Sequence, residues 1–247
     1  MTFLQIVNKV LRKLREDEVS SVAESEYSKL IGEFVNDAKD WMEDIWFWSV
    51  YETSISTAIT GDSSTTDYDL TGTTDRSFLI RRERDGLPLA FDVTSGDIGG
   101  QLHDMSYKDL RSKQAIDGGT STTTHPSTFA IKPDADGRGY TIELLWPASA
   151  ARTWETHWYV PQATLEVDST DDGTNVLLPS NPLIAGALYF ALNERGEEMG
   201  ESGIIAEKRW HRALAAAQEL DMQVNKVSDQ IDMTNLERLR TNLSEIY

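Results

Sequence analysis

The stretch WMEDIWFWSVYETSISTAIT, residues 41–60, marks a change in the period of the chain's apolar residues. Before it, apolar residues recur every three to four positions, as on one face of a helix. From Tyr51 onward polar and apolar residues alternate, which is the period of a strand. The aromatic residues at the change of period predict a hydrophobic joint between helices and strands, with an aromatic ligand platform as the alternative. The joint residues are Trp41, Ile45, Trp46, Phe47 and Trp48.

Two amphipathic helices are predicted in residues 1–50. The first carries its apolar face on Phe3, Ile6, Val7, Val10, Leu11 and Leu14. The second is expected to open at a capping box formed by Ser21 and Glu24 and to run into the tryptophan-rich stretch. A hairpin of two such helices cannot bury both apolar faces by itself, so it needs further elements to pack against.

Residues 51–180 read as an inserted β domain. Short strand candidates follow one another, separated by turn signals such as Asp85-Gly86 and Asp136-Gly137. They are TTDYDLT, RSFLIRR, LPLAFDV, STFAIKP, GYTIELLWP, TWETHWYVP and ATLEVD. This spacing is typical of an antiparallel sandwich or barrel, interrupted by one short helix at about residues 105–115.

The helical period returns in residues 181–228. Asn181 is a candidate N-cap with Pro182 at the first helical position, and a break at Gly200 to Gly203 separates two helices. The predicted fold class is therefore α+β: a four-helix body built from both chain ends, an inserted antiparallel β-sandwich or barrel, and a C-terminal extension over residues 229–247.

Composition narrows the function classes. The chain has 247 residues, 41 acidic against 23 basic, for a net charge of −18, so its surface should repel nucleic acid. It has no cysteine, which excludes disulfides and thiolate metal sites. It has no apolar run of about 20 residues, the length that spans a bilayer, and no secretory signal is expected. No membrane partner is predicted.

The search for chemistry finds no catalytic, cofactor or metal motif. Glu155 and His157 share one face of a strand candidate and could form an acid–base pair, although a surface pair is the favoured interpretation. An aromatic sugar-binding platform is the second alternative, against an ordinary sandwich core. Its residues would be Trp154, Trp158 and Tyr159. We expect the protein not to be an enzyme.

The C-terminal extension carries a thin apolar stripe that is too weak for a self-sufficient helix. Such a segment often orders on a partner, although a last helix packed on its own body or a disordered end would also fit. The residues expected at the partner interface are Ile231, Leu236, Leu239, Leu243, Ile246 and Tyr247.

Three stretches resemble the head-to-tail adaptor proteins of tailed bacteriophages, in particular the tail-tubular-protein-A-like group. They are TFLQIVNKVLRKL, SEYSKLIGEFVNDAKDWMEDIWFWS and NPLIAGALYFALNERGEE. The residues that carry the likeness in the first two are Phe3, Ile6, Val7, Leu11, Tyr27, Leu30, Ile31, Val35, Asn36, Ala38, Trp46 and Trp48. Together the stretches cover about a third of the chain, and the β segment matches by architecture alone.

The resemblance implies a structural role in the virion. Family members form rings, commonly twelve-fold, beneath the portal protein and join it to a downstream tail component such as a nozzle, stopper or tail terminator. DNA passes through the ring without sequence-specific binding, and C-terminal extensions dock into the portal. Assembly would take place in the host cytoplasm, without a cofactor. The alternative function is a β-sandwich module that binds glycans.

Overall fold

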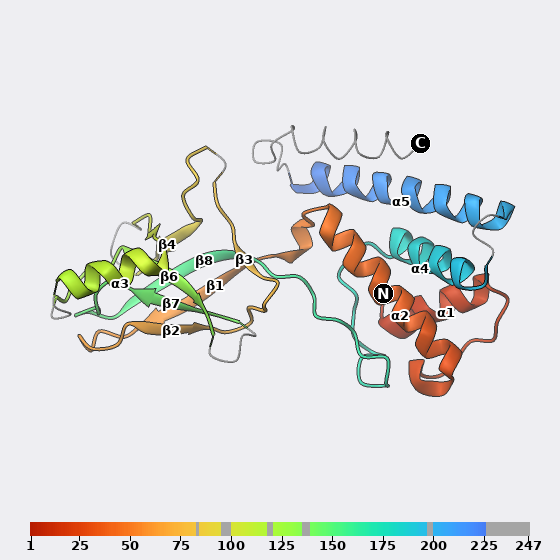
Figure 1. The fold of residues 1–247 in the computed structure, drawn as a ribbon, viewed down its shortest axis with the longest axis horizontal. Coiled ribbons are helices and arrows are strands. Elements are labelled where there is room, and N and C mark those ends of the chain that lie inside the picture. The colour runs from red at the N-terminus through yellow and green to blue at the C-terminus, as the bar shows by residue number, and fades with distance from the viewer. Residues whose placement is uncertain (83, 95–99, 118–120, 135–138, 197–199, 226–247) are drawn as a thin grey trace. The chain divides into compact units, whose positions relative to one another are not determined.

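The computed structural model describes residues 1–82, 84–94, 100–117, 121–134, 139–196 and 200–225 (Figure 1). The described chain is α+β, with five α-helices and two four-stranded sheets. It divides into two compact units. The helical unit comprises residues 1–50 and the described residues from Gln162 onward, and the β unit comprises residues 51–161.

The N-terminal half of the helical unit contains α1 (Phe3–Lys13) and α2 (Glu26–Ile45). The side chain of Thr2 caps α1 together with Gln5. The predicted start of α2 at Ser21 is wrong. Ser21 caps a short 3-10 helix, Val22–Glu24, and α2 begins after Ser25, whose hydroxyl accepts the backbone N–H of Ser28 at 3.0 Å. Two serines four residues apart both offer a cap, and the later one opens the α-helix.

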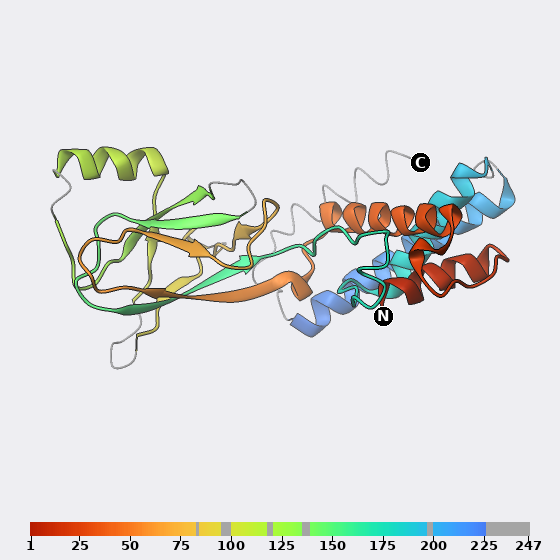
Figure 2. The same cartoon turned by 90° about the horizontal axis from the view of Figure 1, so that it is seen from below.

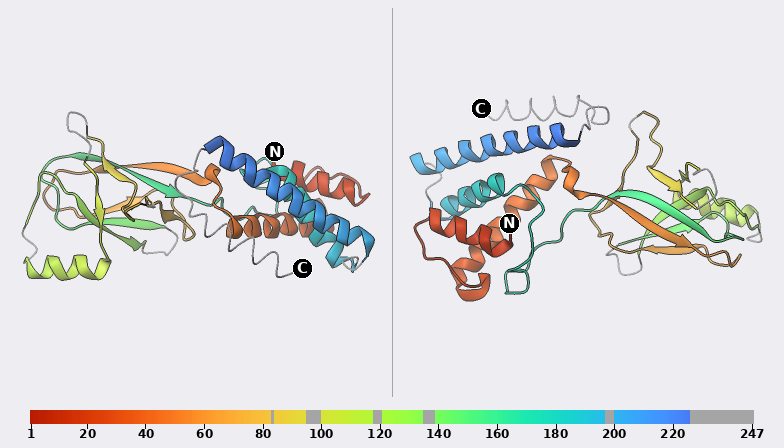
Figure 3. Two further views of the ribbon diagram at one scale, coloured as in Figure 1. Left: turned by 90° about the horizontal axis from the view of Figure 1, so that it is seen from above. Right: turned by 180° about the vertical axis from the view of Figure 1, so that it is seen from behind.

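The C-terminal half of the helical unit contains α4 (Ser180–Glu194) and α5 (Glu201–Asn225). The predicted cap at Asn181 is wrong, because α4 already includes Ser180 and Pro179 precedes it without a side-chain cap. α4 packs against α1, α2 and α5, and α5 runs beside α4 (Figure 3). The buried residues of α4 are Pro182, Leu183, Ile184, Ala185, Gly186, Ala187, Ala191 and Leu192.

The closest approach in this unit is at Gly186 of α4. A Cβ atom placed there would lie 2.8 Å from Cε2 of Trp210 on α5 and 3.0 Å from Cβ of Ala38 on α2. Glycine is therefore required in mid-helix, where it normally costs about 1 kcal/mol relative to alanine. The missing side chain lets α5 seat its tryptophan directly on the α4 backbone.

Residues 162–179 belong to the helical unit, whereas the sequence placed them in the β domain up to residue 180. The side-chain amide of Asn36 holds this segment, because its Nδ2 donates to the carbonyl of Leu165 at 2.8 Å and its Oδ1 accepts the N–H of Leu165 at 3.1 Å. Further along, Asp172 accepts the N–H of Val22 at 3.1 Å. The predicted strand ATLEVD forms no strand: the peptide groups of Leu165 bond to Asn36 on α2, and the N–H of Glu166 donates to Asp171 at 2.8 Å.

The β unit begins with a sheet of four strands in which β8 (Arg152–Tyr159) is central. β1 (Glu52–Ile59) pairs along one side of β8, and β3 (Phe78–Leu79) and β4 (Ala90–Asp92) share the other side. All of these pairs are antiparallel, and β1 matches β8 residue for residue over its full length.

The second sheet has the order β2-β7-β6-β5, with bounds β2 Asp67–Leu70, β7 Tyr140–Leu144, β6 Thr128–Pro133 and β5 His103–Asp104. The β5–β6 pair is parallel, which the antiparallel prediction did not include. The reason is the crossover through α3 (Tyr107–Ile116), which lies against β6 (Figure 2). A helix at about residues 105–115 was predicted, and α3 confirms it. Over the described residues the two sheets remain separate and close no barrel.

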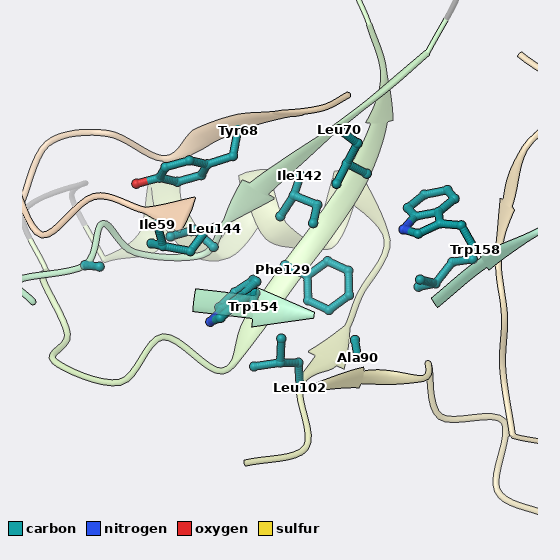
Figure 4. Close-up of a cluster of buried hydrophobic side chains, with 12 residues drawn as sticks. Ile59, Tyr68, Leu70, Ala90, Leu102, Phe129, Ile142, Leu144, Trp154 and Trp158 are labelled. Carbon is teal, nitrogen blue, oxygen red and sulfur yellow. The ribbon is translucent and has the colours of Figure 1, made fainter. Parts of the chain in front are cut away.

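The two sheets share one apolar core, which Figure 4 shows with Phe129 among the side chains of both sheets. Trp154 and Trp158 enter it from β8, and Ile142 and Leu144 enter it from β7. This arrangement places alternate residues of each strand inside, as in a sandwich.

We expect Gly186→Ala to lower the free energy of unfolding of the helical unit by roughly 1–3 kcal/mol, because the added methyl group overpacks the contact with Trp210. Urea denaturation followed by circular dichroism would measure it. Gly173→Ala is the control, since a Cβ there meets no atom within 4 Å. A Gly186→Ala protein as stable as the control would contradict the close packing.

Candidate interaction sites

Two of the three tryptophans of the joint stretch, Trp46 and Trp48, are buried. Trp46 is 5% exposed and Trp48 is 1% exposed. The indole N–H of Trp46 donates to Asp221 Oδ2 at 3.1 Å, and that of Trp48 donates to the carbonyl of Met42 at 2.8 Å. Both indoles thus combine a large apolar contact with a satisfied donor, which makes this end of α2 rigid.

Asp221, near the end of α5, is the polar centre of this corner. Besides the Trp46 indole, it accepts the hydroxyl of Ser49 at 2.5 Å and the backbone N–H of Ser49 at 3.4 Å. Three donors from the chain just after α2 therefore converge on one carboxylate of α5. Residue spacing does not reveal this role, because Asp221 lies 175 residues from Trp46 and other acidic residues stand on the same helix.

The other joint residues lie differently. The rings of Trp41 and Trp210 are 4.4 Å apart, so Trp41 joins α2 to α5. Ile45 is half-buried, and Phe47 is 61% exposed. The expected packing of the joint against the strands stays a prediction.

Exposed apolar residues neighbour Ser49 and Asp221 in the sequence of the helical unit. Leu220 is 61% exposed and Met222 is 39% exposed, one on each side of Asp221, while Val50 directly follows Ser49 and is 45% exposed. We call Phe47, Val50, Leu220 and Met222 the α5-end surface. The chain passes from this surface into its last 22 residues. The predicted interface residues lie there, outside the described residues: Ile231, Leu236, Leu239, Leu243, Ile246 and Tyr247.

The sugar-binding platform is wrong. Trp154 is fully buried, Trp158 is 1% exposed and Tyr159 is 4% exposed, so none of the three offers a ring face to a ligand. The ring of Trp154 packs on that of Phe129, with 5.8 Å between the ring centroids. The indole N–H of Trp158 donates to the hydroxyl of Thr156 at 2.9 Å. Alternating aromatic residues on β8 serve the sandwich core, which was the competing interpretation.

The acid–base pair is a surface pair. His157 Nε2 lies 3.2 Å from Glu155 Oε1, with both side chains more than a third exposed. Among the described residues no group of three His, Asp or Glu side chains is placed to hold a metal ion. In the same part of the chain, no helix has both the length and the apolar character to cross a membrane.

The described features are packing contacts and exposed apolar side chains rather than a reaction centre, and the family comparison agrees with them. The model of the family described as SU10 adaptor protein matches residues 1–240. The chain belongs to this family. The match confirms the resemblance to phage head-to-tail adaptors, which rested on about a third of the chain. A search among curated proteins gives no match.

Charge divides the surface of this adaptor's helical unit. Partial burial and the repulsion of Asp40 raise the pKa of Asp37 on α2. Partial burial and the nearby positive charges of Arg209 and Lys9 lower the pKa of Lys13 on α1. Like charges therefore lie near each other at both positions, and their repulsion adds to the effect of burial.

The helical unit of the adaptor also buries the ammonium group of Lys39. The side chain of Lys39 on α2 has no exposed surface, and its Nζ lies 3.2 Å from Glu43 Oε1 and 3.0 Å from Asp40 Oδ1. A buried ammonium needs such partners, because taking it out of water without them costs several kcal/mol. The pair fixes the orientation of this turn of α2 next to the joint.

We expect Asp221→Ala to destabilise the helical unit by roughly 1.5–3 kcal/mol, because three donors, one of them a buried indole, lose a charged acceptor. Chemical denaturation monitored by tryptophan fluorescence would detect the change. Glu219→Ala on the same helix is the matched control, since Glu219 is exposed and accepts only a 3.4 Å bond from Gln223 among the described contacts. Equal effects of the two variants would contradict the role of Asp221.

Proposed function

We propose that this adaptor forms a ring beneath the portal protein and connects it to the tail, with DNA passing through the central channel. The observation that carries the proposal is the family match over residues 1–240. The net charge of −18 supports it, because an acidic wall does not retain passing DNA. The protein acts as a structural component of the virion and not as an enzyme.

We further infer a division of labour along the chain. α1, α2, α4 and α5 would form a rigid four-helix body, with joint residues fixing the end of α2 to α5 within it. Support comes from the satisfied Trp46 and Trp48 indoles and from the contact of Trp41 with Trp210. The ring would contain about twelve copies, as the resemblance implies, assembled in the host cytoplasm.

The C-terminal extension, residues 229–247, is the proposed portal-docking segment. It follows the α5-end surface, whose Leu220 and Met222 are exposed. Apolar side chains on both sides of the point where the extension begins fit a partner that covers the two together. On the opposite side, the ring would meet a nozzle, stopper or tail terminator.

We expect deletion of residues 229–247 to abolish binding to purified portal while leaving the thermal unfolding transition cooperative. Co-sedimentation of the adaptor with portal would measure binding. A finer test replaces Leu236 and Leu243 by serine. The control replaces the two residues that directly precede them, Asn235 and Asn242, by serine. Portal binding that survives the deletion would remove the docking role from this segment.

Electron microscopy of the adaptor mixed with portal would test the ring itself. The expected particle has the adaptor as a closed ring on the portal axis. Peptide mass spectrometry of purified virions should find the chain at a copy number near that of the portal protein and far below that of the major capsid protein. Its absence from particles that contain portal would overturn the proposed function.

A further inference from the structure

The edge strand β1 is an open template for another strand. β1 lies at the end of its sheet and pairs with β8 alone, over residues Glu52–Ile59. Within the described part of the chain, no backbone hydrogen bond joins residues 53–59 to an element other than β8. Over residues 53–59, one side of β1 therefore presents its peptide groups outward.

The register identifies which peptide groups these are. The N–H of Val160 donates to the carbonyl of Tyr51 at 2.9 Å, so Tyr51 and Val160 form a hydrogen-bonded pair. In an antiparallel ladder such pairs alternate, which assigns Thr53, Ile55 and Thr57 to β8. The intervening Ser54, Ser56 and Ala58 point their N–H and C=O groups away from β8.

The far side of β8 agrees with this assignment. His157, which lies opposite Ser54, donates its N–H to the carbonyl of Leu89 at 2.9 Å, and its carbonyl accepts the N–H of Ile80 at 2.9 Å. Both peptide groups of His157 are therefore used on the side away from β1. The outward direction of the Ser54 peptide groups follows from two independent sets of bonds.

After its first residue, the charged Glu52, β1 lacks the devices that normally protect an edge. Residues 53–59 contain no charged residue and no proline, and the unbroken register with β8 leaves no bulge. The outward residues Ser54, Ser56 and Ala58 are small and exposed, so a second backbone can approach. The other edges are short: β3 and β5 have two residues each, and the four-residue β2 carries Asp67 and Asp69.

We propose that the free adaptor associates with a second copy of itself by antiparallel pairing of β1 with β1 about a two-fold axis at Ile55. In this register Ser54 lies opposite Ser56 of the second copy, and Thr53 lies opposite Thr57. The strand is complementary to itself there, because small hydroxyl residues face each other and no like charges meet.

Ile55 supplies the apolar part of the contact. Its side chain is half-buried against the sandwich core, so its remaining exposed surface lies along the β1 edge. The two-fold axis places it in a non-hydrogen-bonded pair with the same residue of the second copy, the pair type in which side chains come closest. One apolar pair and a short ladder make a weak, concentration-dependent dimer.

This pairing does not depend on the proposed ring. A two-fold interface is closed after two copies, whereas a ring needs head-to-tail contacts between different surfaces. Pairing at β1 therefore cannot build the ring by itself. In the free adaptor it would keep the β1 edge from joining unrelated strands.

Sedimentation velocity of the full chain across a wide concentration range tests the proposal. The expected result is a reversible monomer–dimer equilibrium. Hydrogen exchange by NMR should slow with concentration at Ser54, Ser56 and Ala58, while Thr53, Ile55 and Thr57 stay protected at every concentration. Absence of a dimer at all concentrations would overturn the proposal, and so would exchange rates at Ser54 and Ser56 that do not change with concentration.

Ser54→Pro is the decisive variant. Proline removes the N–H of residue 54, which points away from β8, so the hydrogen bonds between β1 and β8 stay intact. We expect it to weaken dimerisation by about tenfold or more. Ser54→Lys, which keeps the backbone donor, should weaken it as well, because the two lysines lie diagonally across the axis. Ser112→Lys on exposed α3 controls for charge, and circular dichroism controls for folding.

A dimer unaffected by Ser54→Pro and Ser54→Lys would overturn the assignment to β1. Rings that form in the absence of any β1-dependent dimer would overturn the inference and leave the proposed function standing. A β1-dependent dimer that never binds portal would support the inference and count against the proposed function.

Discussion

The helical unit depends on one constraint: α4 is apolar around most of its circumference. Eight of its residues are buried, and they fall on every side of the helix. A helix of this kind is not stable against water on any face, so it must be covered all round. α1 and α2 cover it from the N-terminal part of the chain, and α5 covers it from the C-terminal part. The covering helices come from both parts of the chain, so the segment between them, residues 51–161, forms an insert within the helical unit.

Polar contacts then fix what apolar packing leaves adjustable. The side-chain amide of Asn36 donates one hydrogen bond to the backbone of Leu165 and accepts another from it. Asn8 forms the same pair of hydrogen bonds with Val19, each 2.9 Å long. Each asparagine lies on a helix and hydrogen-bonds to the backbone N–H and C=O of a loop residue, as a neighbouring strand would in a sheet. Asp221 does the equivalent for the indole of Trp46. Such directional bonds fix the position of a loop along a helix, which apolar contacts alone do not.

The sequence predicted the periodic elements well and the connections poorly. The faces of α1 and α2 and the alternation in β1 and β8 follow from residue spacing. Which of Ser21 and Ser25 would open α2 depends on a local competition that spacing does not resolve. ATLEVD has a strand's alternation, but Asn36 takes the peptide groups of Leu165. Leu220 is apolar and 61% exposed, which its place in a helical segment does not reveal.

The joining of the two chain ends also fixes an order of events during synthesis. The bond between Trp46 and Asp221 spans 175 residues, so the α1–α2 hairpin leaves the ribosome long before the helix that completes it. At about 5–20 residues per second the wait lasts roughly ten seconds or more. The β unit, by contrast, is one continuous stretch and can fold as soon as β8 emerges. The insert can therefore fold first, and the α1–α2 hairpin keeps its apolar stripe uncovered until α5 has been synthesised.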